Sequence, residues 1–249
     1  MGSPNAQEPL LLSVVVPAYN ERPTIVEQLR RVALTPFEKE IVVVDDGSDD
    51  GTREYLAAVV KGEEQIVDAD GRPVPVKVIL QARNRGKGAA LRRAFGEVRG
   101  DIVLIQDADL EYDPRDYEAL IRPIREGVAD VVYGSRFLGG PQRVHLFWHS
   151  VGNRALTLLS NALNNLNLTD METGFKVFRR EVIADIGPTL RSSRFGIEPE
   201  ITAKVARRGY RIYETPIAYH GRDYSGGKKI TWRDGLAAVY HVVRFRLAD

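Results

Sequence analysis

The chain has 249 residues, of which 43% are hydrophobic, and its 35 lysines and arginines stand against 34 aspartates and glutamates. This length is enough for a full core, as one large domain or two small ones. The balanced charge excludes an overall field that would attract nucleic acid, so any site for a polyanion must be local. The absence of cysteine excludes disulfides, thiolate metal sites and a cysteine nucleophile.

We expect no targeting signal at the beginning of this sequence. Residues 1–9 are polar and are expected to form a flexible terminus. The apolar run over residues 10–16 is interrupted by Ser13 and stopped by Pro17, which makes it too short for a signal peptide. No 18 apolar residues run together, so we expect no transmembrane domain and a cytoplasmic protein.

Strand and helix patterns alternate along the first half of the chain. Short runs of β-favouring apolar residues predict buried strands, and apolar residues at helical spacing predict helices between them. The expected strands are residues 10–16, 40–45, 76–80, 102–105 and 130–133, and the expected helices are residues 24–34, 52–60, 89–98 and 117–125. This alternation is typical of an α/β fold, with a mostly parallel, Rossmann-like sheet and helices on both faces.

The second half predicts a long helix over residues 148–167, a short element at 177–178, a helix over 195–208 and an edge strand over 211–217. Residues 231–249 have the pattern of an amphipathic helix, whose apolar stripe is Trp232, Leu236, Val239, Val243 and Leu247. Such a stripe usually faces a core. Peripheral contact with a membrane is the alternative, because Arg244 and Arg246 lie beside it. No repeat or low-complexity linker divides the chain, so residues 1–249 are expected to form a single domain.

The most informative pattern is a cluster of carboxylates directly after the strand at 102–105. Asp107 and Asp109 are two residues apart, so on an extended segment they point to the same side. They repel each other unless a cation lies between them or one proton is shared. A divalent metal is the simpler solution, and hard oxygen ligands with Glu111 nearby suit Mg²⁺ or Mn²⁺.

The same tripeptide occurs a second time and serves as a control. Asp68-Ala-Asp70 runs into Gly71 and a proline, which is turn chemistry, and it follows no apolar strand. We therefore expect this copy to be a loop tip within a polar hairpin or loop over residues 61–75.

Several other polar residues are expected on the same edge as the carboxylates, because ligands of open parallel sheets bind outside the carboxyl ends of the strands. The expected rim contains Tyr19, Glu21, Asp45, Asp46, Asp107 and Asp109, with Lys87, Arg136, Arg222, Lys228 and Lys229 as available cations. A metal beside cations is what a nucleoside diphosphate leaving group needs. Neither the P-loop spacing nor the dinucleotide-binding glycine pattern is present.

These motifs resemble family 2 glycosyltransferases of the GT-A fold, close to the dolichyl-phosphate mannose and glucose synthases. The matching segments are residues 15–21, 44–52, 84–88, 107–109 and 134–137, in family order. The resemblance implies an inverting, metal-dependent enzyme. Its donor would be a nucleotide-diphosphate sugar of the GDP-mannose or UDP-glucose type, and its acceptor a polyprenyl or dolichyl phosphate.

The resemblance also implies roles for individual residues. By this resemblance, the donor-binding residues are Pro17, Tyr19, Glu21, Val44, Asp46, Lys87, Asp107 and Arg222. The metal ligands are Asp107, Asp109 and Glu111. The acceptor-binding residues are Ser135, Arg136 and Lys229, and the catalytic residues are Asp109, Arg136 and Asp170. Position 111 departs from the mannose synthases, which carry glutamine there.

The acceptor decides whether a general base is needed. A lipid phosphate is already ionised at neutral pH, whereas a hydroxyl acceptor requires a base, for which Asp170 and Glu172 are the candidates. Asp170 has an equal alternative as the cap of a turn. A nucleotide-sugar-binding protein that has lost turnover is the alternative from another class. A nucleotidyltransferase is disfavoured, because the first loop is not glycine-rich and does not end in lysine.

Overall fold

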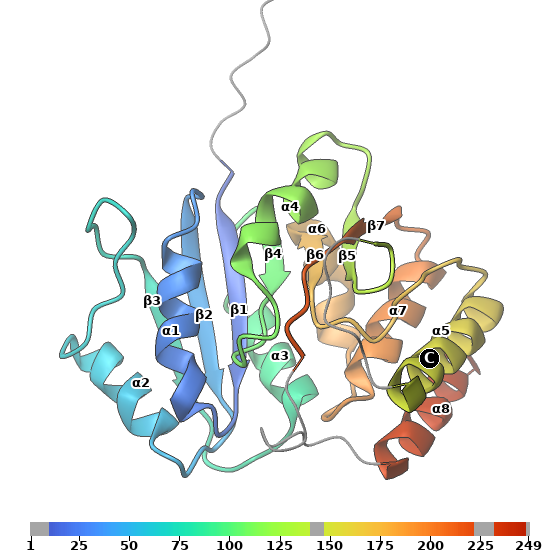
Figure 1. The fold of residues 1–249 in the computed structure, drawn as a ribbon, viewed down its shortest axis with the longest axis horizontal. Coiled ribbons are helices and arrows are strands. Elements are labelled where there is room, and N and C mark those ends of the chain that lie inside the picture. The colour runs from blue at the N-terminus through green and yellow to red at the C-terminus, as the bar shows by residue number, and fades with distance from the viewer. Residues whose placement is uncertain (1–9, 140–146, 222–231, 248–249) are drawn as a thin grey trace, which may run out of the picture.

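The computed structural model describes residues 10–139, 147–221 and 232–247 (Figure 1). In these ranges seven strands form one sheet in the order β3-β2-β1-β4-β6-β5-β7. The strands are β1 (Leu12–Ala18), β2 (Lys39–Asp45), β3 (Val76–Leu80), β4 (Ile102–Ile105), β5 (Val131–Ser135), β6 (Lys176–Arg179) and β7 (Ile212–Pro216). Strand β6 runs antiparallel to its neighbours β4 and β5, and the other pairings are parallel. The expected mostly parallel sheet is confirmed, with β7 as the expected edge strand.

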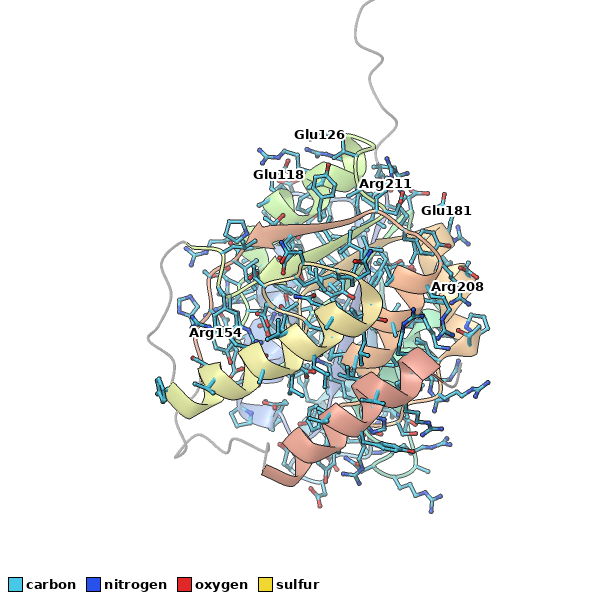
Figure 2. All side chains as sticks on the ribbon, turned by 90° about the vertical axis from the view of Figure 1, so that its right-hand side faces the viewer. Glu118, Glu126, Arg154, Glu181, Arg208 and Arg211 are labelled. Carbon is cyan, nitrogen blue, oxygen red and sulfur yellow. The ribbon has the colours of Figure 1, made fainter. Side chains whose placement is uncertain are left out.

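Helices cover both faces of the sheet. They are α1 (Arg22–Ala33), α2 (Thr52–Lys61), α3 (Lys87–Phe95), α4 (Tyr117–Arg125), α5 (Phe147–Asn164), α6 (Arg180–Ile186), α7 (Ile197–Arg207) and α8 (Trp232–Leu247), with short 3-10 turns η1 (Pro114–Asp116) and η2 (Gly187–Thr189). Helices α1, α2 and α4 pack on one face, and α3, α6 and α7 on the other. Helices α5 and α8 lie side by side over α7 (Figure 2). None of the described helices is long and apolar enough to cross a membrane.

The alternation of β1 explains how one strand serves two cores. Val14 and Val16 point to the α1 and α4 side, whereas Val15 points to the α3 side, and all three are 0% exposed. Successive side chains of a strand face opposite ways, so an unbroken apolar run requires cover on both faces. The sequence pattern therefore predicted the two-sided burial correctly.

The expectation that Pro17 ends the first strand is wrong, because β1 continues through Pro17 to Ala18. The Val15 carbonyl accepts from Gln106 on the β4 side, and the Ala18 carbonyl accepts from Asp46 on the β2 side. Pro17, two residues after Val15, therefore has its missing N–H on the β4 side, where β4 has already ended at Ile105. Because no residue of β4 lies opposite Pro17, the missing N–H costs no strand-to-strand hydrogen bond, and the proline does not break the strand.

Other boundaries differ by a few residues, and one helix was missed. Helix α5 ends at Asn164 and not at residue 167, because Asn165 adopts the left-handed conformation (φ 54°) that terminates helices. Helix α6 was not expected. The predicted loop tip at residues 68–70 is confirmed, since Val67 and Pro73 pair as an isolated antiparallel bridge and Asp68 accepts from the backbone of Asp70.

Candidate active site

Three adjacent parallel strands, β2, β1 and β4, end at one edge of the sheet, and the predicted rim residues follow them. Asp46 comes directly after β2, Tyr19 directly after β1 and Asp107 two residues after β4. Hydrogen bonds from Asp46 to Ala18 and from Gln106 to Val15 tie these strand ends together. The expected acidic rim is thus formed by neighbouring strand ends.

A chain of alternating charges connects this rim to helix α7. The Lys87 ammonium lies 2.8 Å from Oδ1 of Asp107 and 3.2 Å from Oε1 of Glu198. The other carboxylate oxygen of Glu198 accepts from the Lys176 ammonium at 2.5 Å. Burial alone would lower the pKa of Lys87, but the charges of Asp107 and Glu198 outweigh it and hold that pKa above its usual value. The order Asp107, Lys87, Glu198, Lys176 balances two negative charges with two positive ones.

Glycines set the backbone that brings these charges together. Lys87 is the first residue of helix α3 and follows Gly86, which has a φ of 94°. A Cβ on Gly86 would overlap the carbonyl oxygen of Ser193. A Cβ on Gly174 would overlap Oδ2 of Asp107. Only glycine allows the 170–174 loop to approach the Asp107 carboxylate this closely.

The three predicted metal ligands do not form one cluster. Among the described residues, no three acidic, histidine or cysteine side chains lie close enough to hold a metal ion. Glu111 is drawn aside because its Oε2 accepts from the Tyr219 hydroxyl at 2.7 Å, and Asp107 is paired with Lys87. Asp107 and Asp109 remain as candidate ligands, although the segment is not extended as expected: it forms a turn in which Leu110 has a φ of 63° and the Glu111 amide donates to Asp109. Two such ligands fit Mg²⁺ or Mn²⁺, which take one or two carboxylates and complete their shell with water and phosphate oxygens.

Arg136 and Asp170, far apart in sequence, form a buried ion pair. The guanidinium donates from Nε and Nη2 to the two carboxylate oxygens at 2.6 and 2.8 Å, and the Arg136 amide donates to the same carboxylate. Asn153 donates a further hydrogen bond to Asp170, whose side chain is 0% exposed. Asp170 therefore holds Arg136 in place and is not arranged to accept a proton from an acceptor.

Glu172, the other candidate base, has a different environment. Its Oε1 is buried and has no hydrogen-bond partner among the described residues. Burial raises the pKa of the Glu172 carboxyl to about 7, and the negative charge of Glu198 adds to this. It lies in the loop between Asp170, which binds Arg136, and Gly174, which contacts Asp107. A carboxyl with this pKa is suited to proton transfer near neutral pH.

Three other predicted contacts have buried side chains. Val44 is a core residue with 0% exposure, so its side chain does not face a donor. Ser135 is equally buried and shares a hydrogen bond with Thr169, so it does not face an acceptor. The carboxylate of Asp46 accepts from the amides of Arg85 and Gly86, and so shapes the loop before α3.

The remaining predicted residues are of two kinds. Pro17 and Glu21 flank Tyr19 at the end of β1 and the start of α1. Arg222, Lys228, Lys229 and the expected flexible residues 1–9 lie outside the described residues, as do the side chains of Trp232, Leu236 and Leu247.

Sequence reasoning missed Glu198, Lys176 and Tyr219. Glu198 was assigned only to the opening of a helix, since acids are common in first turns. Its role as a partner of Lys87 follows from a contact across 111 residues of sequence, for which the pattern holds no signal.

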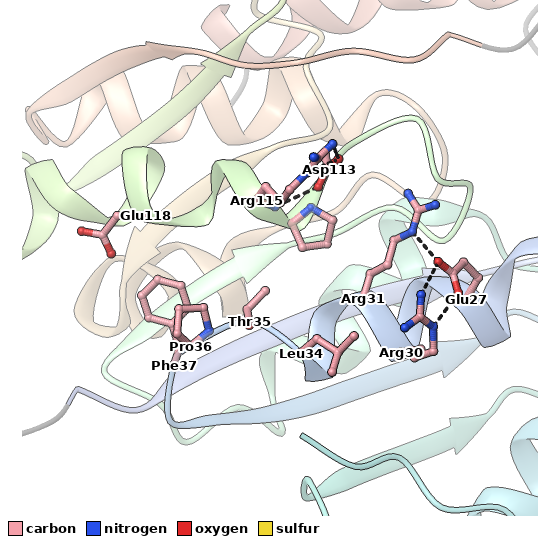
Figure 3. Close-up of a pocket in the computed structure, with 11 residues that line it drawn as sticks. Glu27, Arg30, Arg31, Leu34, Thr35, Pro36, Phe37, Asp113, Arg115 and Glu118 are labelled. Carbon is pink, nitrogen blue, oxygen red and sulfur yellow. Dashed lines mark hydrogen bonds and ion pairs between the residues drawn. The ribbon is translucent and has the colours of Figure 1, made fainter. Parts of the chain in front are cut away.

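A separate hollow of about 570 Å³ lies between α1 and the start of α4 (Figure 3). None of the predicted site residues lines it. The charges on its wall pair locally, Glu27 with Arg30 and Arg31, and Arg115 with Asp113. The hollow is therefore separate from the acidic rim, and we assign it no part in the candidate active site.

The fold and the rim define an α/β enzyme with an acidic site at the carboxyl ends of parallel strands. The model of the family described as glycosyl transferase family 2 matches residues 13–187. The chain belongs to this glycosyltransferase family. The resemblance inferred from the motifs and the assignment as a glycosyltransferase are thereby confirmed.

Curated relatives share about three residues in ten with this chain. Dolichol-phosphate mannosyltransferase of Pyrococcus furiosus is 31% identical over 94% of this chain and 63% of its own length. Dolichyl-phosphate beta-glucosyltransferase of Saccharomyces cerevisiae is 30% identical over 97% of this chain and 75% of its own length. Glycosyltransferase AglD of Haloferax volcanii is 31% identical over 87% of this chain, which spans only 35% of that relative.

A solved structure supports the fold. Glucosyl-3-phosphoglycerate synthase from Mycobacterium tuberculosis, in complex with Mn²⁺, uridine diphosphate and glucosyl-3-phosphoglycerate, superposes with a TM-score of 0.69. The match covers 96% of this chain and 79% of that one, at 21% identity. The expected GT-A fold is confirmed.

Proposed function

We propose that this glycosyltransferase moves a hexose from a nucleotide-diphosphate sugar to a polyprenyl phosphate, with inversion and with Mg²⁺ or Mn²⁺ bound. The observation that carries the proposal is Asp107, which follows β4 together with Asp109 and lies 2.8 Å from the Lys87 ammonium. Two relatives at about 30% identity, named as dolichol-phosphate mannosyltransferase and dolichyl-phosphate beta-glucosyltransferase, support the acceptor class.

On the donor side, Asp107 and Asp109 would hold the metal, and Lys87 would face the diphosphate. A divalent ion there supplies charge neutralisation for the leaving nucleoside diphosphate. The structural neighbour was solved with Mn²⁺ and uridine diphosphate bound, which supports a divalent metal in this proposal. Lys87 is positioned for the role because it lies 2.8 Å from Asp107 and opens α3, whose N-terminus also favours anions.

On the acceptor side, Arg136 would bind the lipid phosphate. Asp170 accepts hydrogen bonds from Nε and Nη2 of Arg136. Within the described residues, no group accepts a hydrogen bond from Nη1 of Arg136. A guanidinium held in this way is pre-oriented, so little rotational freedom is lost when a phosphate binds. The phosphate oxygen is already ionised at neutral pH and attacks without a base, so orientation and electrostatics supply the rate enhancement.

The chain offers its own control for the metal ligands. In a transfer assay with UDP-glucose or GDP-mannose, Mn²⁺ and polyprenyl phosphate, Asp109→Asn should abolish turnover. Asp70→Asn changes the corresponding residue of the second Asp-Ala-Asp copy, which lies on an exposed loop paired with Arg72, and should leave turnover unchanged. Full turnover of Asp109→Asn, or of the wild type in excess EDTA, would remove the metal from the proposal.

A hydroxyl acceptor is the second candidate, and Glu172 is the observation that favours it. A carboxyl with a pKa of about 7, and with a buried oxygen that has no hydrogen-bond partner in the described part of the chain, is suited to take a proton from a hydroxyl. Glu172→Gln separates the two candidates, because it removes the base and leaves the charge of a lipid phosphate unaffected. Turnover that survives this change supports the lipid phosphate, and its loss supports the hydroxyl.

Delivery of a lipid acceptor requires contact with a membrane, and we propose that α5 and α8 make it. Phe147, Val151 and Leu158 of α5 are 69%, 40% and 70% exposed. Among the described side chains of α8, Ala238, Val242 and Phe245 are buried, whereas Val239 and Tyr240 are 41% and 59% exposed. The stripe expected to face the core is therefore partly on the outer side. Helix α5 contains no acidic residue, which suits an anionic lipid surface.

A further inference from the structure

The four charges that link the rim to α7 differ in how firmly each is held. The Lys176 ammonium is 0% exposed and donates to the Met171 and Thr173 carbonyls and to Glu198, at 3.1, 2.5 and 2.5 Å. It also lies 4.7 Å from the centre of the Tyr133 ring. With three oxygen acceptors and an aromatic face around it, Lys176 is fixed and anchors Glu198.

Lys87 is held by fewer groups than Lys176. Its side chain is 17% exposed, and its two partners are both carboxylates, Asp107 on the rim and Glu198 toward the core. Glu198 is 4% exposed and is itself held by Lys176. Lys87 can therefore release Asp107 and still retain a buried counter-ion.

Both carboxylate oxygens of Asp107, by contrast, are closely approached by neighbouring groups. The backbone at Gly174 lies so close to Oδ2 of Asp107 that no Cβ would fit between them, while Oδ1 faces Lys87. A divalent cation that binds Asp107 must therefore approach the place where Lys87 already neutralises the carboxylate. Like charges at such a separation repel strongly unless an anion lies between them.

We propose that Lys87 is an exchangeable counter-cation of Asp107, held in reserve by Glu198, so that metal binds tightly only together with a diphosphate. This inference rests on the proposed nucleotide-sugar donor and adds a coupling between its two parts. Free metal competes with Lys87 for Asp107. A diphosphate supplies the negative charge that draws Lys87 off Asp107 and leaves that carboxylate for the metal. Glu198 is then a positioning residue, which acts on the site only through Lys87.

Calorimetric titration of Mn²⁺ tests the exchange without any turnover. In the wild type, saturating UDP or GDP should strengthen Mn²⁺ binding, and by linkage Mn²⁺ should strengthen nucleotide binding by the same factor. Lys87→Met removes the competitor, so Mn²⁺ alone should bind at least about 5-fold more tightly than to the wild type, the lower end of usual coupling factors. The enhancement by nucleotide should shrink. Lys77→Met is the matched control, because Lys77 forms an exposed pair with Glu97 away from the rim.

A second variant gives a change of opposite sign. Glu198→Gln removes the second carboxylate that pairs with Lys87, so that Asp107 is its remaining carboxylate partner. Mn²⁺ without nucleotide should therefore bind this variant more weakly than the wild type. Damage to the fold would weaken metal binding in both variants. Opposite shifts in Lys87→Met and Glu198→Gln support the exchange, and shifts in the same direction overturn it.

The two proposals fail in different ways. If UDP or GDP binds the wild type but Mn²⁺ binds equally well with and without it, the exchange is overturned and the nucleotide-sugar donor stands. If neither nucleotide binds in the presence of Mn²⁺, the proposed donor class is overturned, and the exchange with it.

Discussion

The guanidinium of Arg136 and the carboxylate of Asp170 form two parallel hydrogen bonds, at 2.6 and 2.8 Å, although 34 residues of sequence separate them. The pair joins the end of β5 to the loop before β6, and its carboxylate is entirely buried. Sequence patterns had suggested separate roles for the two residues, as acceptor ligand and candidate base. Their pairing shows that they act as a unit, with Asp170 orienting Arg136.

The first prediction concerns the stability of this pair. Asp170→Asn leaves the Arg136 charge buried without its counter-ion, and breaking a buried pair on one side usually costs about 3 to 5 kcal/mol. Glu118→Gln, which breaks the exposed pair with Arg125, should cost at most about 1 kcal/mol. Urea unfolding of both variants measures the difference. Similar small losses in the two would show that the Arg136–Asp170 pair is not effectively buried.

The second prediction concerns Gly174. Gly174→Ala places a methyl group against Oδ2 of Asp107 and the Tyr112 ring, so the carboxylate must shift and transfer activity should fall by about 100-fold, the scale of a 1 Å misplacement. Gly96→Ala is the control, since its Cβ would have 3.7 Å to the nearest atom, and it should retain wild-type activity. A crystal structure or Mn²⁺ titration of Gly174→Ala locates the effect. An alanine variant with full activity would contradict the close approach of the loop to Asp107.

The third prediction is a pH dependence of stability caused by Glu172. Its pKa rises from 4.5 in the unfolded chain to about 7 in the fold, so between these values the folded state binds more protons. Stability is therefore lost as the pH rises from 4.5 to 7, by up to about 3 kcal/mol. Glu172→Gln stays neutral and should flatten this part of the profile, whereas the exposed Glu63→Gln should not. Urea unfolding at pH 5 and pH 7.5 compares them, and an unchanged slope in Glu172→Gln would assign the dependence to another group.

The sequence was a good guide wherever local pattern decides the structure. The strands at 76–80 and 102–105 and the helix at 117–125 have the predicted bounds, because their apolar spacing has a single interpretation. The rim was predictable for a related reason, since parallel strands that end in polar residues must present them at one edge. Asp46 and Asp107 needed no long-range information to be placed there.

Long-range pairing was beyond this reasoning. Nothing near Lys87 indicates that Glu198 binds it, or that Tyr219 draws Glu111 away from the other carboxylates. These contacts depend on how α7 and the segment after β7 fold back over the rim. The motif predicted which residue types gather at the site, but the partner of each charge is set by tertiary packing.

The last prediction tests the outer face formed by α5 and α8, which lie side by side (Figure 2). Leu158 and Tyr240 are 70% and 59% exposed, and burying one large apolar side chain in a lipid interface contributes roughly 1.5 to 3 kcal/mol. The double variant Leu158→Ser with Tyr240→Ser should therefore reduce binding to anionic vesicles by more than about tenfold in a sedimentation assay. Val60→Ser is the matched control, since Val60 is 62% exposed but lies on α2, at the far side of the molecule in Figure 1. High salt should also weaken wild-type binding, because the exposed Arg154 and Arg244 add electrostatic attraction that ions screen. Equal amounts of wild-type protein in the supernatant with and without vesicles would leave this face without a role in membrane contact, and the acceptor would then have to reach Arg136 from solution.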